Sequence, residues 1–268
     1  MGNFLIFDIG SNATKASLVE TDTRDFLKNW RVETKLGRHI GTDGVMSLDA
    51  VRFNIAAVLD IVSACGGVAC RCIGTEALRR AANGAEIVSM FADAGLTLEI
   101  LSASREAELE RIAIRHSSVV LARPGEAYVL IDSGGSSTEC SIIRADGSVA
   151  YAESFGFGQH RLIDMLQGAS EDVCAEMIGA LERELGCVRA AFVVAAGSSF
   201  TTYAMESLGV SAPGGVEGLS VLACGAAESL AAQAGRVLVN DLSERLGLPV
   251  YVSTFGIRHG WIFEHFGA

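Results

Sequence analysis

The chain has 268 residues, of which 50% are hydrophobic and 20% charged, so it can bury one or two cores and is not a disordered chain. Its 21 basic and 32 acidic residues give a net charge of −11, which argues against a protein that binds duplex nucleic acid through a basic face. The first apolar run is short and ends at Asp8, so we expect neither a signal peptide nor a membrane span, and a cytoplasmic protein.

An apolar strand that ends in Asp, a turn of small residues and a second apolar run occur twice. The first copy runs from Phe4 to Glu20 and contains Asp8-Ile-Gly-Ser-Asn. The second runs from Tyr128 to Arg144 and contains Asp132-Ser-Gly-Gly-Ser-Ser. Each copy is typical of a hairpin inside a buried sheet. The repetition predicts two similar domains that open with the same unit.

The segments between the two copies alternate between strand and helix patterns. We expect helices at 48–64, 76–82, 85–94 and 105–115, the last with Ser104 as its N-cap, and strands at 68–73 and 96–101. Pro and Gly in residues 122–126 mark the boundary between the halves. The second half predicts strands at 128–133, 138–144, 148–154 and 191–195, and helices at 158–167, 170–185, from Phe200 and from Gly218. This alternation predicts an α/β fold.

Seven cysteines occur without paired CxxC motifs or a nearby histidine. We therefore expect free thiols rather than a zinc site. They are Cys65, Cys70, Cys72, Cys140, Cys174, Cys187 and Cys224.

The two turns carry residues suited to phosphate chemistry. Small residues directly after a strand let backbone N–H groups converge on an anion. Asp8 and Asp132, at the two strand ends, are the ligand type that Mg²⁺ prefers. An Asp in this place also caps its own turn, so each copy alone leaves both interpretations open. Together they favour a phosphate and metal site.

Six segments in this order resemble the exopolyphosphatase/guanosine pentaphosphate phosphohydrolase (Ppx/GppA) family of the sugar-kinase/Hsp70/actin superfamily. The resemblance covers nearly the whole chain. It implies two ribonuclease-H-like (actin-like ATPase) domains with an interdomain cleft, at 1–122 and 123–255, with a C-terminal helix at about 256–268 packing back onto the first. The segments are Asp8-Ile-Gly-Ser-Asn12, Ala77-Leu-Arg-Arg-Ala-Ala-Asn83, Ser104-Arg-Glu-Ala107, Asp132-Ser-Gly-Gly-Ser-Ser-Thr-Glu139, Gly158-Gln-His-Arg-Leu162 and Gly256-Ile-Arg-His-Gly260.

The resemblance also implies hydrolysis of a terminal phosphoanhydride. Glu106 matches the carboxylate that activates water, Glu139 the second acidic residue at the metal or water, and Arg79 an arginine that neutralises the transferring group. Asp8, Asp132 and Glu139 would hold Mg²⁺. The phosphates would be cradled by two sets of residues, Gly10, Ser11, Asn12 and Lys15 in the first domain and Gly134, Gly135, Ser136 and Ser137 in the second.

Four departures from the family pattern bear on the substrate. Lys15 stands where an arginine is common, Arg105 replaces a carboxylate beside Glu106, and Ser136 replaces a third glycine. Ala196-Gly-Ser-Ser199 replaces a more glycine-rich turn.

The net charge of −11 favours a nucleotide or short polyphosphate over a long polyanion. A phosphotransferase or kinase of the same superfamily and a non-catalytic nucleotide-sensing protein stay open. So does a homodimer, since an apolar dimer face and a large core both account for the mean hydropathy of +0.35.

Overall fold

A computed structural model describes residues 2–168, 172–221 and 227–267. Their contacts divide into two compact units, one of residues 1–113 with 257–268 and one of residues 114–256. The division lies inside helix α4 (Ala103–Arg115), before the boundary of 122/123 that the sequence suggests. The reason is that the end of α4 already belongs to the second core, where Ile114 packs in one cluster with Tyr128.

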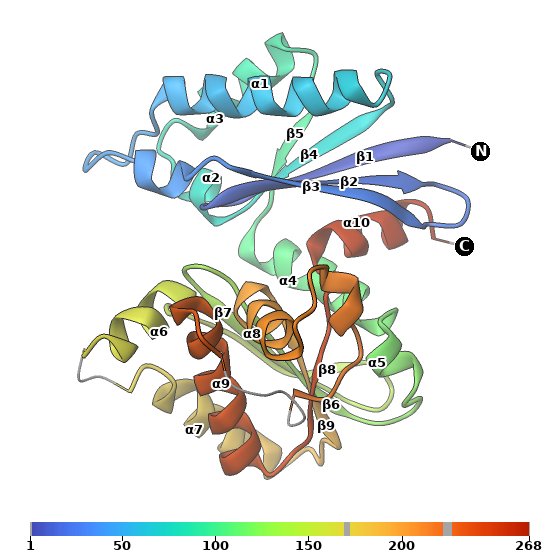
Figure 1. The fold of residues 1–268 in the computed structure, drawn as a ribbon, viewed down its shortest axis with the longest axis vertical. Coiled ribbons are helices and arrows are strands. Elements are labelled where there is room, and N and C mark those ends of the chain that lie inside the picture. Colours follow the sequence, from blue (N-terminus) through green and yellow to red (C-terminus); the bar gives the residue numbers. More distant parts are fainter. Residues whose placement is uncertain (1, 169–171, 222–226, 268) are drawn as a thin grey trace. The chain divides into compact units, whose positions relative to one another are not determined.

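The first unit is built on a five-stranded sheet in the order β3-β2-β1-β4-β5 (Figure 1). Strands β1 (Asn3–Ile9), β2 (Ala13–Glu20) and β3 (Phe26–Glu33) pair antiparallel. Strands β4 (Cys70–Gly74) and β5 (Leu98–Ile100) extend the sheet in parallel on the other side of β1. The long third strand, β3, has no counterpart among the expected elements.

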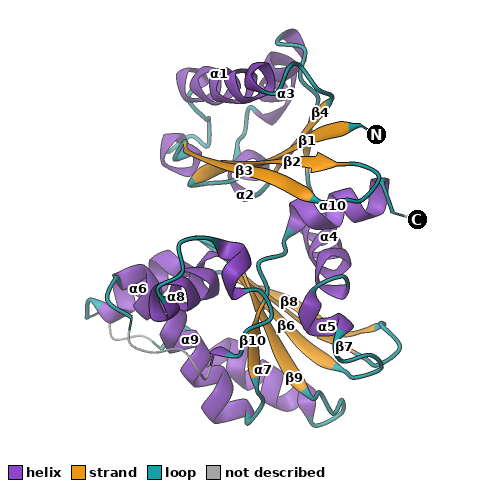
Figure 2. Cartoon of the chain, turned by 45° about the vertical axis from the view of Figure 1, so that its right-hand side comes forward, coloured by secondary structure: helices purple, strands orange, loops and turns teal. Residues whose placement is uncertain are grey.

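Helices cover both faces of this sheet (Figure 2). Leu5, Phe7 and Ile9 of β1 face α1 (Leu48–Ala64) and α3 (Gly84–Asp93) in one buried cluster. Ile6 faces the opposite way and packs with α4 and with α10 (Ile257–His265). The alternation along β1 therefore places Asp8 on the face that α10 covers. Two short elements complete the unit, η1 (Leu36–His39) and α2 (Glu76–Arg80).

The second unit contains a five-stranded sheet in the order β10-β9-β6-β7-β8. Its strands are β6 (Tyr128–Ser133), β7 (Thr138–Ile143), β8 (Val149–Phe155), β9 (Phe192–Ala196) and β10 (Val250–Val252). One face packs against α6 (Gln159–Leu166), α7 (Ala175–Leu185), α8 (Ser198–Leu208) and α9 (Leu230–Leu246). The other face packs against α5 (Ser118–Leu121) and the end of α4. A short helix, η2 (Pro213–Val216), follows α8 in the chain.

The two sheets have the same topology. In each, the central strand pairs antiparallel with the next strand, which in turn pairs antiparallel with the third. On its other side the central strand pairs parallel with a later strand, which pairs parallel with the last one. Strands β1, β2 and β3 therefore correspond to β6, β7 and β8. The repetition noted in the sequence is confirmed as a repeated fold.

Three local expectations are wrong. Helix α4 begins at Ala103, and its cap is Ser102, whose hydroxyl accepts the 3.1 Å hydrogen bond from the Arg105 N–H, so Ser104 lies inside the helix. No helix begins at Gly218, whose φ of 77° is left-handed; the next described helix is α9. Helix α7 begins at Ala175 rather than at 170, and residues 169–171 and 222–226 lie outside the described part of the chain.

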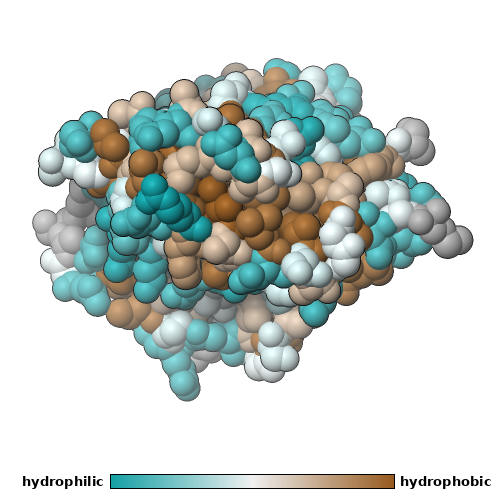
Figure 3. Space-filling view, turned by 90° about the horizontal axis from the view of Figure 1, so that it is seen from above, coloured by the Kyte–Doolittle hydropathy of each residue, from teal (hydrophilic) through white to brown (hydrophobic). Residues whose placement is uncertain are grey.

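The surface and the thiols complete the description. The six cysteines in the described residues are free, as expected, and Cys224 lies outside them. Helix α1 exposes Phe53 and Leu59. Figure 3 shows the face of the molecule seen from above Figure 1, where apolar residues lie between hydrophilic margins. None of the described helices has the length and apolar character that crossing a membrane requires.

Candidate functional site

The two Asp-Gly loops have the same local structure. Asp8 is the second-last residue of β1 and Asp132 the second-last residue of β6. After each strand, a glycine N–H closes the turn: Gly10 N donates to the Ala13 carbonyl at 3.1 Å, and Gly134 N to the Ser137 carbonyl at 3.0 Å. We call Asp8–Asn12 the first loop and Asp132–Ser137 the second loop.

The carbonyls of the first loop are bound by the segment around η1. The Asn12 carbonyl accepts from Thr34 N at 3.2 Å and Lys35 N at 2.9 Å, and the Ser11 carbonyl accepts from Gly37 N at 2.9 Å. A trans peptide points its N–H opposite to its C=O. The N–H groups that follow these carbonyls therefore point away from η1, as anion binding by the backbone requires.

The second loop is held in the same way by the start of α6. Gln159 N donates to the Gly134 carbonyl at 2.9 Å and His160 N to the Gly135 carbonyl at 3.1 Å. Gly158 packs so closely that a Cβ there would lie 2.7 Å from the Gly134 carbonyl oxygen and 2.8 Å from Ser136 N. This contact explains the glycine that opens the Gly158-Gln-His-Arg segment.

Glu106 and Arg79 meet in the first unit. The Arg79 Nη1 donates to Glu106 Oε2 at 2.9 Å and to the Leu101 carbonyl at 2.9 Å. The side chains are 31% and 21% exposed, so this ion pair between α2 and α4 is largely shielded from water. The structure thus brings together two of the three residues that the sequence assigned to catalysis.

Glu76 links the first loop to α2 and was not singled out in the sequence. Ser11 Oγ donates to Glu76 Oε2 at 2.7 Å, and Arg80 donates to Glu76 Oε1 at 2.9 Å. The Ser11 hydroxyl is therefore engaged by a side chain of α2. The sequence offered one signal for Glu76: it lies three residues before Arg79 in the same expected helix.

Asp132 and Glu139 lie directly opposite each other on β6 and β7. Opposed residues of antiparallel strands project from one face, and like charges there destabilise the sheet. Ser154 of β8 donates to Glu139 Oε1 at 2.9 Å. A divalent cation would relieve the repulsion, so this carboxylate pair fits Mg²⁺, which prefers oxygen ligands.

The backbone of the turn after β9 lies against Asp132. Gly197 has a φ of 93°, and a Cβ there would lie 2.4 Å from Asp132 Oδ1 and 2.4 Å from the Ser133 carbonyl oxygen. Two residues after Gly197, Ser199 places its Oγ 3.1 Å from Ser133 Oγ. The departure Ala196-Gly-Ser-Ser199 therefore keeps the one glycine that the close approach requires.

Asp8 lies opposite Lys15 in the first sheet, and Lys15 opposite Arg31. The C-terminal helix α10 adds Arg258, which donates to Ser17 Oγ and, at 3.3 Å, to Asn29 Oδ1. Burial lowers the pKa of Arg258, and the nearby Asp8 carboxylate opposes this effect. Neither Arg31 nor Arg258 was among the predicted site residues.

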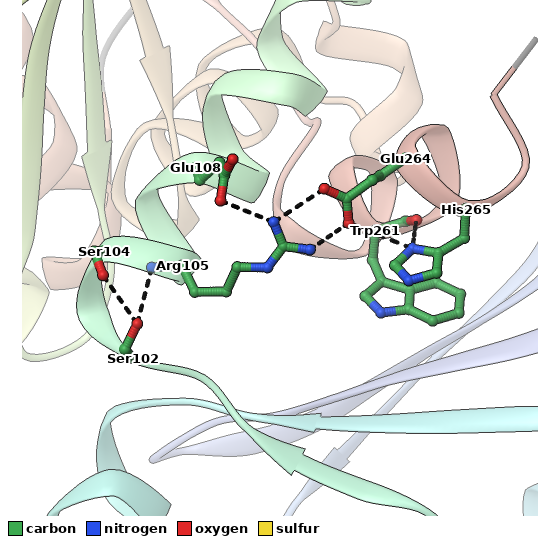
Figure 4. Close-up of polar contacts among 7 residues, drawn as sticks. All are labelled: Ser102, Ser104, Arg105, Glu108, Trp261, Glu264 and His265. Atoms are coloured by element: carbon green, nitrogen blue, oxygen red, sulfur yellow. Dashed lines mark hydrogen bonds and ion pairs between the residues drawn. The ribbon is translucent and has the colours of Figure 1, made fainter.

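Helix α10 also binds α4 directly (Figure 4). Arg105 donates to Glu264 Oε1 at 3.0 Å, to Glu264 Oε2 and to Glu108 Oε2 at 2.8 Å. The arginine that replaces a family carboxylate beside Glu106 therefore has a carboxylate partner on the C-terminal helix. The pairing holds the helix that carries Glu106.

One group of described side chains lies close enough to hold a metal by distance alone, and it is outside the predicted set. Asp172, Cys174 and Asp241 place their ligand atoms within 4.8 Å of one another. Asp172 Oδ1 accepts a 3.1 Å hydrogen bond from Cys174 N, and burial raises the pKa of the Cys174 thiol. The Asp172 bond lies in the turn that leads into α7, whose N-cap is Cys174, while Asp241 comes from α9.

The chain resembles known proteins in sequence and fold. The profile of the Ppx/GppA phosphatase family matches residues 19–185. No curated protein matches the sequence. The structure of the Ppx/GppA family member from Aquifex aeolicus is similar with a TM-score of 0.74 at 20% identity, over 98% of this chain and 97% of that one.

Two further structures show the same fold. An exopolyphosphatase from Cytophaga hutchinsonii has a TM-score of 0.75 at 19% identity, over 98% of this chain and 97% of that one. The ethanolamine utilization protein EutJ from Carboxydothermus hydrogenoformans has a TM-score of 0.55 at 11% identity, over 100% and 90%. The two units thus have the actin-like ATPase fold. Since the profile covers more than half of the sequence, the chain belongs to the Ppx/GppA phosphatase family.

Proposed function

We propose that the protein is a Mg²⁺-dependent phosphohydrolase that releases phosphate from a nucleotide or a short polyphosphate, with Glu106 as the group that activates water. The observation that carries the proposal is the shielded pair of Glu106 and Arg79, at 2.9 Å. It combines a carboxylate able to accept a proton with a cation able to stabilise charge on a phosphoryl group. Phosphoryl transfer needs these two functions and accurate positioning.

Each side chain has a separate role in this proposal. Glu106 orients a water molecule and accepts its proton, while Arg79 fixes the Glu106 carboxylate through Oε2. The outward N–H groups of the two loops bind phosphate oxygens. The hydrogen bond from Gly37 N to a carbonyl of the first loop and the bond from Gln159 N to a carbonyl of the second loop hold both loops in position for phosphate binding.

Asp8, Asp132 and Glu139 would hold the metal. The opposed carboxylates of Asp132 and Glu139 support this assignment, because two like charges in one row of a sheet favour a bound cation. When bound, Mg²⁺ neutralises charge on the phosphate oxygens. In this proposal the metal is not the only positive charge that attracts the substrate. Lys15, which lies opposite Asp8, adds a second one.

The net charge of −11 supports a short substrate over a long polymer. A processive enzyme for a long polyanion benefits from an extended basic surface, and 32 acidic against 21 basic residues do not favour one. The substrate we propose is therefore a nucleotide or a short inorganic chain.

A phosphate-release screen tests the proposal. The full chain is incubated with nucleoside mono-, di-, tri- and tetraphosphates, guanosine penta- and tetraphosphates and short inorganic polyphosphates, with Mg²⁺ or with EDTA. We expect phosphate release from at least one of them with Mg²⁺ and none with EDTA. Binding of these compounds with no release contradicts a hydrolase, and product that forms only with an added acceptor indicates a phosphotransferase.

A further inference from the structure

A pocket lies where the end of β3 and the short helix η1 meet the start of α1. Its volume is about 400 Å³, which is in the range of small-molecule sites. The chain is joined beside it, because Ser47 N donates to the His39 carbonyl at 2.9 Å. We call it the α1 pocket. Among its lining residues are Thr34, His39, Ser47, Ala50 and Phe53.

The Thr34 hydroxyl is buried beside this pocket and has no hydrogen-bond partner among the described residues. The residue is only 5% exposed. Thr34 continues the alternation of Trp30 and Val32, which pack in one cluster with α1, so its side chain points toward α1. A buried hydroxyl without a partner lowers stability. The pocket therefore contains a polar group that a ligand can satisfy.

The start of α1 supplies further donors to the same pocket. The N–H groups in the first turn of a helix have no acceptor inside the helix, and the helix dipole gives this end a partial positive charge. Ser47 is the N-cap residue, yet within the described chain its side chain makes no capping bond to this 17-residue helix. An anionic group with several oxygens fits this end of the pocket.

The charged side chains at the wall neutralise one another. Glu33 pairs with Lys35 at 3.5 Å, and Asp49 pairs with Arg52 at 2.6 Å. The Asp49 side chain is 92% exposed, so it extends into solvent rather than over the first turn of its own helix. The two pairs leave no net negative charge that would repel an anion.

Phe53 gives the pocket an apolar surface at its outer end. Its side chain is among the exposed large hydrophobic groups of the described chain, at 57%. It lies less than two turns beyond Ser47, or about 9 Å along the axis of α1. The small side chain of Ala50 lies between them. An exposed aromatic ring is a surface on which a nucleobase stacks.

We propose that the α1 pocket binds a nucleoside monophosphate. The phosphate accepts hydrogen bonds from the Thr34 hydroxyl and from the first-turn N–H groups of α1, the ribose lies along Ala50, and the base stacks on Phe53. A phosphate monoester has three terminal oxygens, which match these donors better than the two oxygens of a carboxylate. The site goes beyond the proposed hydrolysis, since that reaction uses none of these side chains.

Calorimetry of the full chain in EDTA tests the proposal with four probes. Adenosine and guanosine monophosphate are the ligands, ribose 5-phosphate lacks the base, and adenosine lacks the phosphate. Thr34→Val removes the hydroxyl, and Phe53→Ala removes the ring. The controls are Thr21→Val, whose hydroxyl donates to the Gly2 carbonyl at 2.9 Å, and Leu59→Ala, an exposed position of α1 outside the pocket.

We expect at least one of the two nucleotides to bind the wild-type protein, and adenosine not to bind. Thr34→Val should weaken binding of the nucleotide and of ribose 5-phosphate about ten-fold or more, because a hydrogen bond to a charged group is lost. Phe53→Ala should weaken binding of the nucleotide alone, about five-fold or more, because stacking is lost. Thr21→Val and Leu59→Ala should bind all probes as the wild type does.

Thermal melting without ligand separates a binding role of Thr34 from a structural one. Thr34→Val should melt at or above the wild-type temperature, because it replaces a buried hydroxyl that has no partner among the described residues. A lower melting temperature would show that the hydroxyl supports the fold and would overturn its assignment.

Three binding results would also overturn the proposal. They are a wild-type protein that binds neither nucleotide, wild-type affinity in both Thr34→Val and Phe53→Ala, and an equal loss in the two control variants. None of these results depends on phosphate release, so the hydrolase proposal is tested separately.

Discussion

Arg79 donates two 2.9 Å hydrogen bonds from one guanidinium nitrogen, to Glu106 Oε2 and to the Leu101 carbonyl. The first bond orients the carboxylate, and the second fixes the arginine against the end of the segment that leads into α4. This geometry is what a group that positions a water molecule requires.

Replacing Arg79 by Gln should lower kcat by roughly 10²-fold, because both the orientation of Glu106 and a positive charge near the phosphoryl group are lost. Steady-state phosphate release measures the effect. Arg80→Gln is the matched control, since Arg80 is its exposed neighbour and pairs with Glu76. A similar loss in both variants would show that Arg79 has no special role.

Replacing Gly158 by Ala should weaken phosphate binding through the second loop. The new Cβ would lie 2.7 Å from the Gly134 carbonyl oxygen, so the loop must shift. We expect a raised KM and a loss of about 1–3 kcal/mol in the free energy of unfolding. At Gly156 a Cβ meets nothing within 4 Å, so Gly156→Ala should leave KM and stability unchanged. A wild-type KM in Gly158→Ala would refute the role of this contact.

Replacing Glu139 by Gln should reduce the affinity for Mg²⁺ about ten-fold or more, because one of two opposed carboxylates is removed. The readout is the rise in melting temperature as Mg²⁺ is added. Glu153→Gln on β8 is the control, since it is paired in register with Cys140, on the opposite face of the sheet from Glu139. Unchanged Mg²⁺ stabilisation in Glu139→Gln would remove this residue from the metal site.

The Arg105–Glu264 pair should make stability depend on pH. The hydrogen bond from Arg105 lowers the pKa of Glu264 below its ordinary value of 4.5, against a smaller effect of burial. A lowered pKa in the folded state means that the stabilisation is complete above about pH 4.5 and is lost as the pH falls through the folded value.

Glu264→Gln should therefore lower the free energy of unfolding at pH 7 by about 0.5–1 kcal/mol, and the difference from wild type should shrink in acid. Urea unfolding at a series of pH values measures it. Glu182→Gln breaks a longer 3.3 Å pair with Arg245 that is more exposed, and a smaller difference is expected there. A difference for Glu264→Gln that does not change with pH would contradict this account.

The repeated hairpins and the helix at 48–64 could be predicted because their signals are local. Helix α1 runs from Leu48 to Ala64 as its apolar period indicates, and Asp8 and Asp132 end equivalent strands. The strand β3 is hard to predict, since it is an edge strand whose side chains are mostly exposed and whose apolar alternation is limited to Trp30 and Val32 near its end.

The partners of the site residues could not be predicted from the sequence, because they come from distant segments. Glu76 binds Ser11 across 65 residues, and Arg258 reaches Ser17 across 241. Ser104 was a plausible cap, but Ser102 is placed to accept the bond, since the chain turns into the helix two residues earlier. Propensity identifies a helix better than it identifies the first residue.

The most direct test of the account is single-turnover phosphate release by Glu106→Gln with Mg²⁺. The account predicts that turnover falls by roughly 10²–10⁴-fold while binding of the same substrate, measured by calorimetry, is nearly unchanged. Glu108→Gln, two residues along α4, should keep wild-type turnover. Wild-type turnover in Glu106→Gln would contradict the account.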